Sequence, residues 1–123
     1  MSERQYLPIE APYVDVRDAI ISTIEDYEDD GCSKRVSVAT TIHRYNDIFL
    51  ENEFEKCLCF FGIAIYQIKN NCLSEMVRYE VECDIEVLET GEYNHLATEE
   101  DWIEIKKDIE WLKPYIFVPE IKE

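Results

Sequence analysis

Cysteine and histidine are the residue types of this chain that could bind a metal ion. The sequence has five cysteines and two histidines, at Cys32, Cys57, Cys59, Cys72, Cys83, His43 and His95. Structural zinc sites usually leave two residues between paired ligands, so that one turn directs both at the ion. The closest pair here is Cys57-x-Cys59, whose spacing puts both side chains on one face of an apolar strand. We therefore expect no metal site and no cofactor.

Nucleophilic catalysis lacks its usual sequence signatures. A reactive cysteine needs an electropositive setting that lowers its thiol pKa, whereas this chain has a formal net charge of -16. No Gly-x-Ser-x-Gly elbow occurs, and three isolated glycines form no phosphate-binding loop. We expect no catalytic residue, and the chain is not predicted to be an enzyme.

Carboxylates are numerous enough for acid-assisted hydrolysis to be considered. Asp84 and Glu86, followed by Glu104-Ile-Lys106, supply the residue types that metal-dependent nucleases use as an acid and a Glu-x-Lys pair. However, Glu-x-Lys falls here on a predicted helix, and an acidic protein repels a polyanionic substrate. We prefer the interpretation that Glu104 and Lys106 belong to a solvated helix face. A glycosidase-type acid pair stays open, because no pocket signal favours it or rules it out.

One group of acids has a regular spacing. Over residues 76–87, apolar residues alternate without a break with Arg78, Glu80, Glu82, Asp84 and Glu86. Strict alternation is typical of a strand with one buried and one solvated face. On such a strand the four carboxylates would form a row with about 7 Å between neighbours. Like charges in a row repel each other, and a basic partner would relieve that repulsion. We therefore predict that this row binds a partner.

A second group of acids could extend this surface if the fold brings it near. Its members lie at the end of one predicted helix and at the start of another: Asp29, Asp30, Glu99, Glu100 and Asp101. Carboxylates near a helix C-terminus, as in Glu25–Asp30, oppose the helix dipole and so break a local rule. The alternative is that all these acids only keep the surface solvated.

Two segments have the pattern of amphipathic helices. Residues 14–29 repeat apolar side chains at helical spacing, and Gly31 provides a stop. Residues 99–113 follow the capping sequence that begins at Thr98. Their core stripe is Trp102, Ile105, Ile109 and Leu112. We expect Pro114 to end this helix and residues 115–118 to add a short edge strand.

Two further segments favour strands. Residues 57–68 are almost wholly apolar, and Ile63, Ile65 and the paired aromatics favour a buried strand, while Gly62 disfavours a helix. Residues 36–44 are rich in β-branched types, although a helix stripe also fits residues 36–56. With 76–87, these segments predict an α+β fold: one domain, residues 1–123, with an antiparallel sheet packed against both helices and an extended arm at 1–12. An all-α bundle is the alternative.

The charge balance is the most informative property of the composition. Asp and Glu number 28 against 12 Lys and Arg, and residues 75–110 alone hold 13 acids and 3 bases. Such a chain is repelled by nucleic acids and by anionic membranes, and it is attracted to basic proteins. The N-terminal sequence has no secretory signal, and an odd number of cysteines argues against a disulfide framework. We expect a cytoplasmic protein with buried free thiols at Cys57, Cys59 and Cys83.

Two classes of function fit these observations. The first is a small acidic inhibitor that neutralises a basic protein: an immunity protein or antitoxin that blocks a nuclease-type toxin, or a viral anti-defence decoy. The second is a non-catalytic adaptor or subunit of a larger intracellular complex. A conspicuous apolar patch would favour the adaptor, since permanent partners bury apolar surface. The candidates for such a patch are Tyr6, Tyr13 and residues 115–118. The partner and the oligomeric state are left open.

Overall fold

The computed structural model describes residues 5–117, apart from the side chains of residues 48–50. Within this part of the chain the regular structure is entirely helical, and no strand occurs. Its elements are α1 (Tyr13–Asp29), α2 (Lys34–Arg44), α3 (Asn46–Glu51), α4 (Glu53–Lys69), α5 (Glu75–Leu88), the short 3-10 helix η1 (Asn94–Leu96) and α6 (Glu99–Ile116). The predicted α+β fold with an antiparallel sheet is therefore wrong, and the all-α alternative is the observed class.

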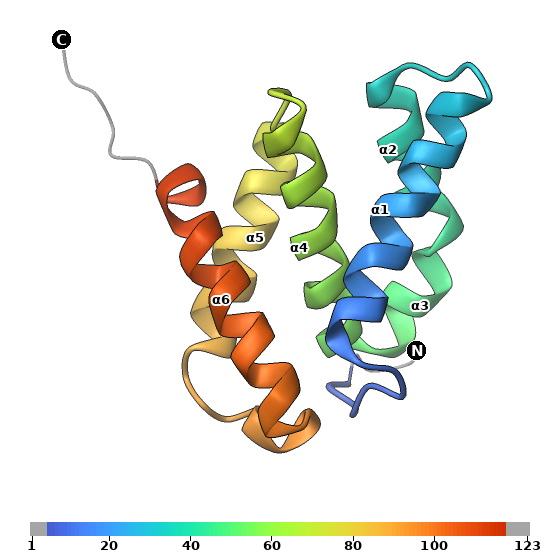
Figure 1. Cartoon of the computed structure of the whole chain (residues 1–123). Helices are drawn as coiled ribbons and strands as arrows, with labels where there is room; N and C mark the ends of the chain where they lie inside the picture. Colours follow the sequence, from blue (N-terminus) through green and yellow to red (C-terminus); the bar gives the residue numbers. More distant parts are fainter. Residues whose placement is uncertain (1–4, 118–123) are drawn as a thin grey trace, which may run out of the picture.

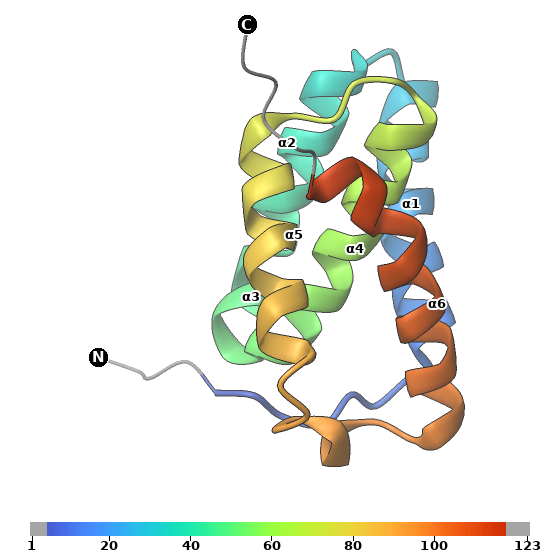
Figure 2. The same cartoon turned by 90° about the vertical axis from the view of Figure 1, so that its left-hand side faces the viewer.

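Helix α4 is the centre of the bundle. Figures 1 and 2 show it between α1 on one side and α5 and α6 on the other, and α3 also packs on it. Of its 17 residues, 13 are buried. A helix that is apolar on all sides needs neighbours on all sides, and α4 has them. The predicted strand at 57–68 is therefore wrong, since this segment is the greater part of a largely buried helix.

Gly62, taken from the sequence as a sign against a helix, instead marks where two helices approach closely. A Cβ atom at this position would lie 2.3 Å from Cγ2 of Ile20 and 3.1 Å from the backbone oxygen of Arg17. Helix α1 can therefore pack against α4 only because residue 62 has no side chain. The propensity of glycine was outweighed by this packing requirement.

The predicted strand at 76–87 is helix α5. The hydroxyl oxygen of Ser74 caps it by accepting a hydrogen bond from the Val77 N–H at 3.3 Å. Val77, Val81 and Ile85 are fully buried, each four residues after the last. In a sequence that alternates apolar and polar residues, positions four apart are all apolar. The alternation therefore also provides the apolar face that a helix needs. Tyr79, the residue that a strand would have buried beside them, is 63% exposed.

The predicted strand at 36–44 is also wrong, since it lies in α2. The Ser33 hydroxyl oxygen caps this helix by accepting from the Val36 N–H. Val38 is buried, and Ile42 and Tyr45 are half-buried, so the alternative helix stripe describes this segment. Phe49, the last member of that stripe, is among the residues whose side chains are outside the description.

The first and last helices agree with the sequence patterns. Helix α1 covers 14–29, and Gly31 follows it with a φ of +104°. Thr98 caps α6 by accepting from the Asp101 N–H at 3.1 Å, and the predicted core stripe of α6 is buried. Pro114 does not end the helix: it lies in the last turn, and α6 continues to Ile116. The expected edge strand is therefore wrong for residues 115 and 116, and residue 118 is outside the described range.

Residues 5–12 form an arm without regular structure across one end of the bundle (Figure 2). The backbone oxygen of Gln5 accepts from the Glu53 N–H at 2.7 Å, and the Leu7 N–H donates to Oδ1 of Asn52 at 3.1 Å. The ring of Tyr6 stacks on that of Tyr93, with 4.2 Å between centroids. The arm thus joins the start of α4 to the loop before α6. No helix in the described part of the chain is long and apolar enough to cross a bilayer.

Candidate functional site

The acidic row predicted on residues 80–86 does not exist as a row. On a helix, successive positions two apart turn by about 200°, so Glu80 and Asp84 lie on one side and Glu82 and Glu86 on another. Glu80 pairs with Lys56 at 3.6 Å, and Glu82 pairs with Arg78 at 2.9 Å. Both acids are half-buried, whereas Glu86 is exposed. On a strand all four acids would have been exposed and unpaired by residues of the core, and of the four only Glu86 is exposed.

Asp84 lies in the interior, with 6% of its surface exposed. Burial and then the charge of the nearby Glu80 raise the pKa of its carboxyl, a hydrogen bond with Cys57 and the charge of Lys56 lower it, and the pKa that results is about 8. Its Oδ2 atom has no hydrogen-bond partner in the described structure. A neutral carboxyl in this position is a feature of the core rather than a contact for a basic partner.

The second predicted group is divided between opposite ends of the bundle. Asp29 and Asp30 lie where α1 ends, and Glu99, Glu100 and Asp101 lie where α6 begins. The first residue of α1 contacts the first turn of α6, because the Tyr13 N–H donates to Oδ1 of Asp101 at 3.0 Å. The length of α1, about 25 Å, therefore separates the two halves of the group. Figure 1 shows these ends at opposite poles.

The structure gathers a different set of acids on the outer face of α1, which we call the α1 acidic face. Five exposed carboxylates follow this face along the helix: Asp15, Asp18, Glu25, Asp26 and Asp29. The one base of the helix, Arg17, pairs with Asp18 of this face at 2.9 Å and with Asp108 of α6 at 3.0 Å, so the other four acids of the face have no base beside them on α1. Of this set, the sequence prediction contained Asp29 alone. The signal was present, since the other four acids also avoid the core stripe of α1.

An exposed aromatic pair on α6 adjoins one end of this face, since Trp111 lines the same hollow as Asp18. Trp111 is 40% exposed and Tyr115 is 44% exposed, and their ring centroids are 5.3 Å apart. Trp111 borders an open hollow of about 280 Å³ whose other lining residues are Arg17, Asp18, Ile21, Ile65, Lys69 and Asp108. Sequence reasoning proposed Tyr115 as part of an apolar patch but missed Trp111. The available signal was that Trp111 is an aromatic residue outside the core stripe of its own helix.

Hydrogen bonds fix the position of α6 beside α1. The hydroxyl of Tyr13 donates to Oδ2 of Asp108, which also accepts from Nη1 of Arg17. Burial and then the charge of Asp108 raise the pKa of Tyr13, so its hydroxyl stays protonated and keeps donating. Tyr13 is fully buried and therefore contributes nothing to an apolar docking patch, and Tyr6 is half-buried against Tyr93.

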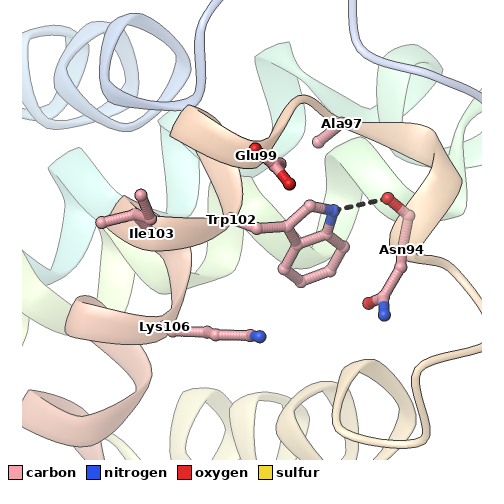
Figure 3. Close-up of a pocket in the computed structure, with 6 residues that line it drawn as sticks. All are labelled: Asn94, Ala97, Glu99, Trp102, Ile103 and Lys106. Carbon is pink, nitrogen blue, oxygen red and sulfur yellow. Dashed lines mark hydrogen bonds between the residues drawn. The ribbon is translucent and has the colours of Figure 1, made fainter.

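A larger cavity, of about 560 Å³, lies beside the start of α6 (Figure 3). Asn94, Ala97, Glu99, Trp102, Ile103 and Lys106 line it. The indole N–H of Trp102 donates to the backbone oxygen of Asn94 at 2.8 Å, which ties the preceding loop to α6. Glu99 and Lys106 are its ionisable residues, and a nucleophile with an adjacent base is not among the lining residues. This cavity has the composition of a loop anchor rather than of a catalytic centre.

The cysteines are free thiols in differing surroundings. Cys57 and Cys59 are buried as predicted, whereas Cys83 is half-buried and Cys72 is exposed. Burial, with a smaller effect of Glu55, raises the pKa of Cys59 to about 12, and burial also raises the pKa of Cys57. Such thiols are poor nucleophiles. Within residues 5–117, cysteines, histidines and acids do not gather in threes in a way that could hold a metal ion.

Comparison of the chain with known protein families, with curated proteins and with solved structures finds no match. The function of this protein must therefore be inferred from its own surface.

Proposed function

We propose that this protein is a small acidic inhibitor that binds and neutralises a basic protein in the cytoplasm. Its partner would be a nuclease-type toxin, with this chain as the immunity protein or antitoxin, or a nucleic-acid-processing enzyme that a viral decoy blocks. The observation that carries the proposal is the α1 acidic face, whose Asp18 lines the same hollow as Trp111 of the exposed Trp111–Tyr115 pair. The acids of α5 are not part of this surface, because Glu80 and Glu82 are paired and Asp84 is buried.

The two parts of this surface have complementary roles in binding. Glu25, Asp26 and Asp29 form no ion pair with any residue that the structure describes, and such carboxylates accelerate the encounter with a positively charged partner. Trp and Tyr are the residue types that most often dominate the affinity of an interface, because they bury a large area at a small entropic cost. A basic cleft with an apolar recess would accept both.

Two acids of the α1 acidic face also interact unfavourably with the dipole of their own helix. Asp26 and Asp29 stand in the last turns of α1, where the helix dipole disfavours negative charge. Glu28 differs, because it is paired with Lys34 at 2.7 Å and bonded to the hydroxyl of Tyr66. The free protein therefore holds unrelieved repulsion at this end, which a partner offering Lys or Arg would remove.

The test begins with capture of the partner from a lysate of the source cell and continues with binding kinetics at low and high salt. Reversing Glu25 and Asp29 to Lys should slow association and reduce its dependence on salt, since exposed charges act mainly through steering. A matched control reverses Glu99 and Glu100, which changes the net charge equally at the far end of the bundle. Trp111→Ala should instead accelerate dissociation, by about tenfold or more if the ring is an interface hot spot.

The same measurements separate an inhibitor from an adaptor. An adaptor held by apolar contacts would bind with an affinity that varies little with salt, and both charge-reversal variants would bind as the original protein does. That result, or an equal effect of the two reversals, would contradict a role for the α1 acidic face.

A further inference from the structure

We propose that the groove between α2 and α5 is a binding site for an amphiphile with a single aliphatic chain and an anionic head group, such as a fatty acid. This site is separate from the α1 acidic face and does not depend on the proposed function. The groove has a volume of about 500 Å³, within the range of small-molecule sites. Its lining residues are Lys34, Arg35, Val38, Ala39, Ile42, Gln67, Cys72, Ser74, Met76 and Val77.

The walls of the groove are apolar. Val38, Ala39 and Ile42 of α2 face Met76 and Val77 in the first turn of α5. From Lys34 to Ile42 the α2 wall is about 12 Å long, which is close to the length of an extended chain of about ten carbons. On the α5 side the lining ends after the first turn. The size of the groove therefore suits one aliphatic chain better than a long helix of another protein.

Gln67 supplies a hydrogen-bond donor at the floor of the groove. Its side chain is only 5% exposed, and its Oε1 accepts from the backbone N–H of Ser74 at 3.1 Å and from the Ser74 hydroxyl at 3.4 Å. Because a backbone N–H can only donate, this contact fixes which end of the amide is the oxygen. The NH₂ group then has no hydrogen bond to any residue that the structure describes. This NH₂ group is not among the enclosed polar atoms of the described structure, so a ligand or a water in the groove can accept from it.

The charges of the groove favour an anion in a protein that is otherwise acidic. Its lining includes the cations Lys34 and Arg35 and no carboxylate. Lys34 forms an ion pair with Glu28, whereas Arg35 is exposed and makes no ion pair with a described residue. The first turn of α2 also lacks an acid, so the positive end of its dipole is uncompensated. At physiological salt, charges farther away than about 8 Å are largely screened, so this local balance governs binding.

The exposed thiol of Cys72 gives a direct readout, because it lines the groove. Decanoate, below its micelle-forming concentration, should bind saturably at one site and slow the labelling of Cys72 by a thiol reagent. Cys32, which is half-buried and outside the groove lining, serves as the internal control. Backbone amide NMR shifts should change in residues 34–42 and 72–77. Decyltrimethylammonium, which has the same chain and the opposite charge, should bind at least tenfold more weakly.

Two variants test the two parts of the site. Ala39→Trp fills the groove from an exposed helical position and should abolish binding with little effect on folding. Arg35→Glu should weaken decanoate binding about tenfold, since reversal replaces an attraction by a repulsion. The matched control Lys107→Glu makes the same charge change on the exposed surface of α6 and should leave the affinity unchanged.

Four results would overturn the proposal. One is the absence of saturable decanoate binding to the original protein, and another is equal binding of the cationic and anionic chains. The third is protection of Cys72 from labelling by an amphipathic peptide of Leu and Glu residues but not by decanoate, which would identify a protein segment as the occupant. Undiminished binding to the folded Ala39→Trp variant would place the fatty acid elsewhere on the molecule.

Discussion

Replacement of Asp84 by Asn should make the protein more stable at alkaline pH. In the folded state burial raises the pKa of this carboxyl to about 8, whereas in an unfolded chain it is about 3.9. Between these values the folded protein keeps a proton that the unfolded chain has released. The stability of the original protein must therefore fall as the pH rises through this window and level off above about pH 8. Asn cannot ionise, so the stability of the variant does not fall in this way as the pH rises.

The magnitude follows from the width of the window. Each pH unit in which the folded state holds one additional proton costs about 1.4 kcal/mol. Between about pH 5 and about pH 8 the difference in unfolding free energy between the variant and the original protein should grow by at most about 4 kcal/mol. Lys56 and the Cys57 thiol stabilise the ionised form of Asp84, and the pKa of about 8 already includes their effect. Relaxation of the core around the ionised carboxylate would make the difference in unfolding free energy smaller than about 4 kcal/mol.

Urea unfolding followed by far-UV circular dichroism at several pH values measures this difference. Glu86→Gln is the matched control, because Glu86 is on the same helix and exposed. Its difference from the original protein should not depend on pH over the same range. A difference for Asp84→Asn that stays constant from about pH 5 to about pH 9, or a variant that is the less stable one at alkaline pH, would mean that Asp84 is ionised and paired in the core.

Three further predictions concern the fold. Gly62→Ala should destabilise the protein by about 1–3 kcal/mol in urea unfolding, since the new Cβ collides with Ile20, and a change below about 0.5 kcal/mol would show that α1 can move aside. Thr98→Ala should cost about 1 kcal/mol by removing the cap of α6, whereas Thr98→Ser should cost much less. Among the thiols, Cys72 should react with a labelling reagent fastest, and Cys57 should react only after unfolding; rapid labelling of Cys57 in the native protein would contradict its burial.

The sequence alone determined the parts of this protein that depend on local rules. Thr98 caps α6 and Gly31 ends α1 in the structure because capping and positive φ act over a few neighbouring residues. The buried stripe of α6 was visible because its outer positions are charged, so the helical period stands out. The excess of acids is a property of composition and required no fold. Pro114 shows the limit even here, since a proline disturbs the turn before it and leaves the residues after it able to stay helical.

Only the tertiary structure decided whether the apolar segments are strands or helices. In α5 the pattern of period two contains the pattern of period four, so Val77, Val81 and Ile85 fit both, and the neighbours α4 and α6 make the difference. In α4 there is no period at all, because every side is covered. The position of a charge depends on the same decision: as a strand residue Asp84 would face water, and as a helix residue it faces the core. Burial is a property of what packs against a residue, and the sequence does not state what that will be.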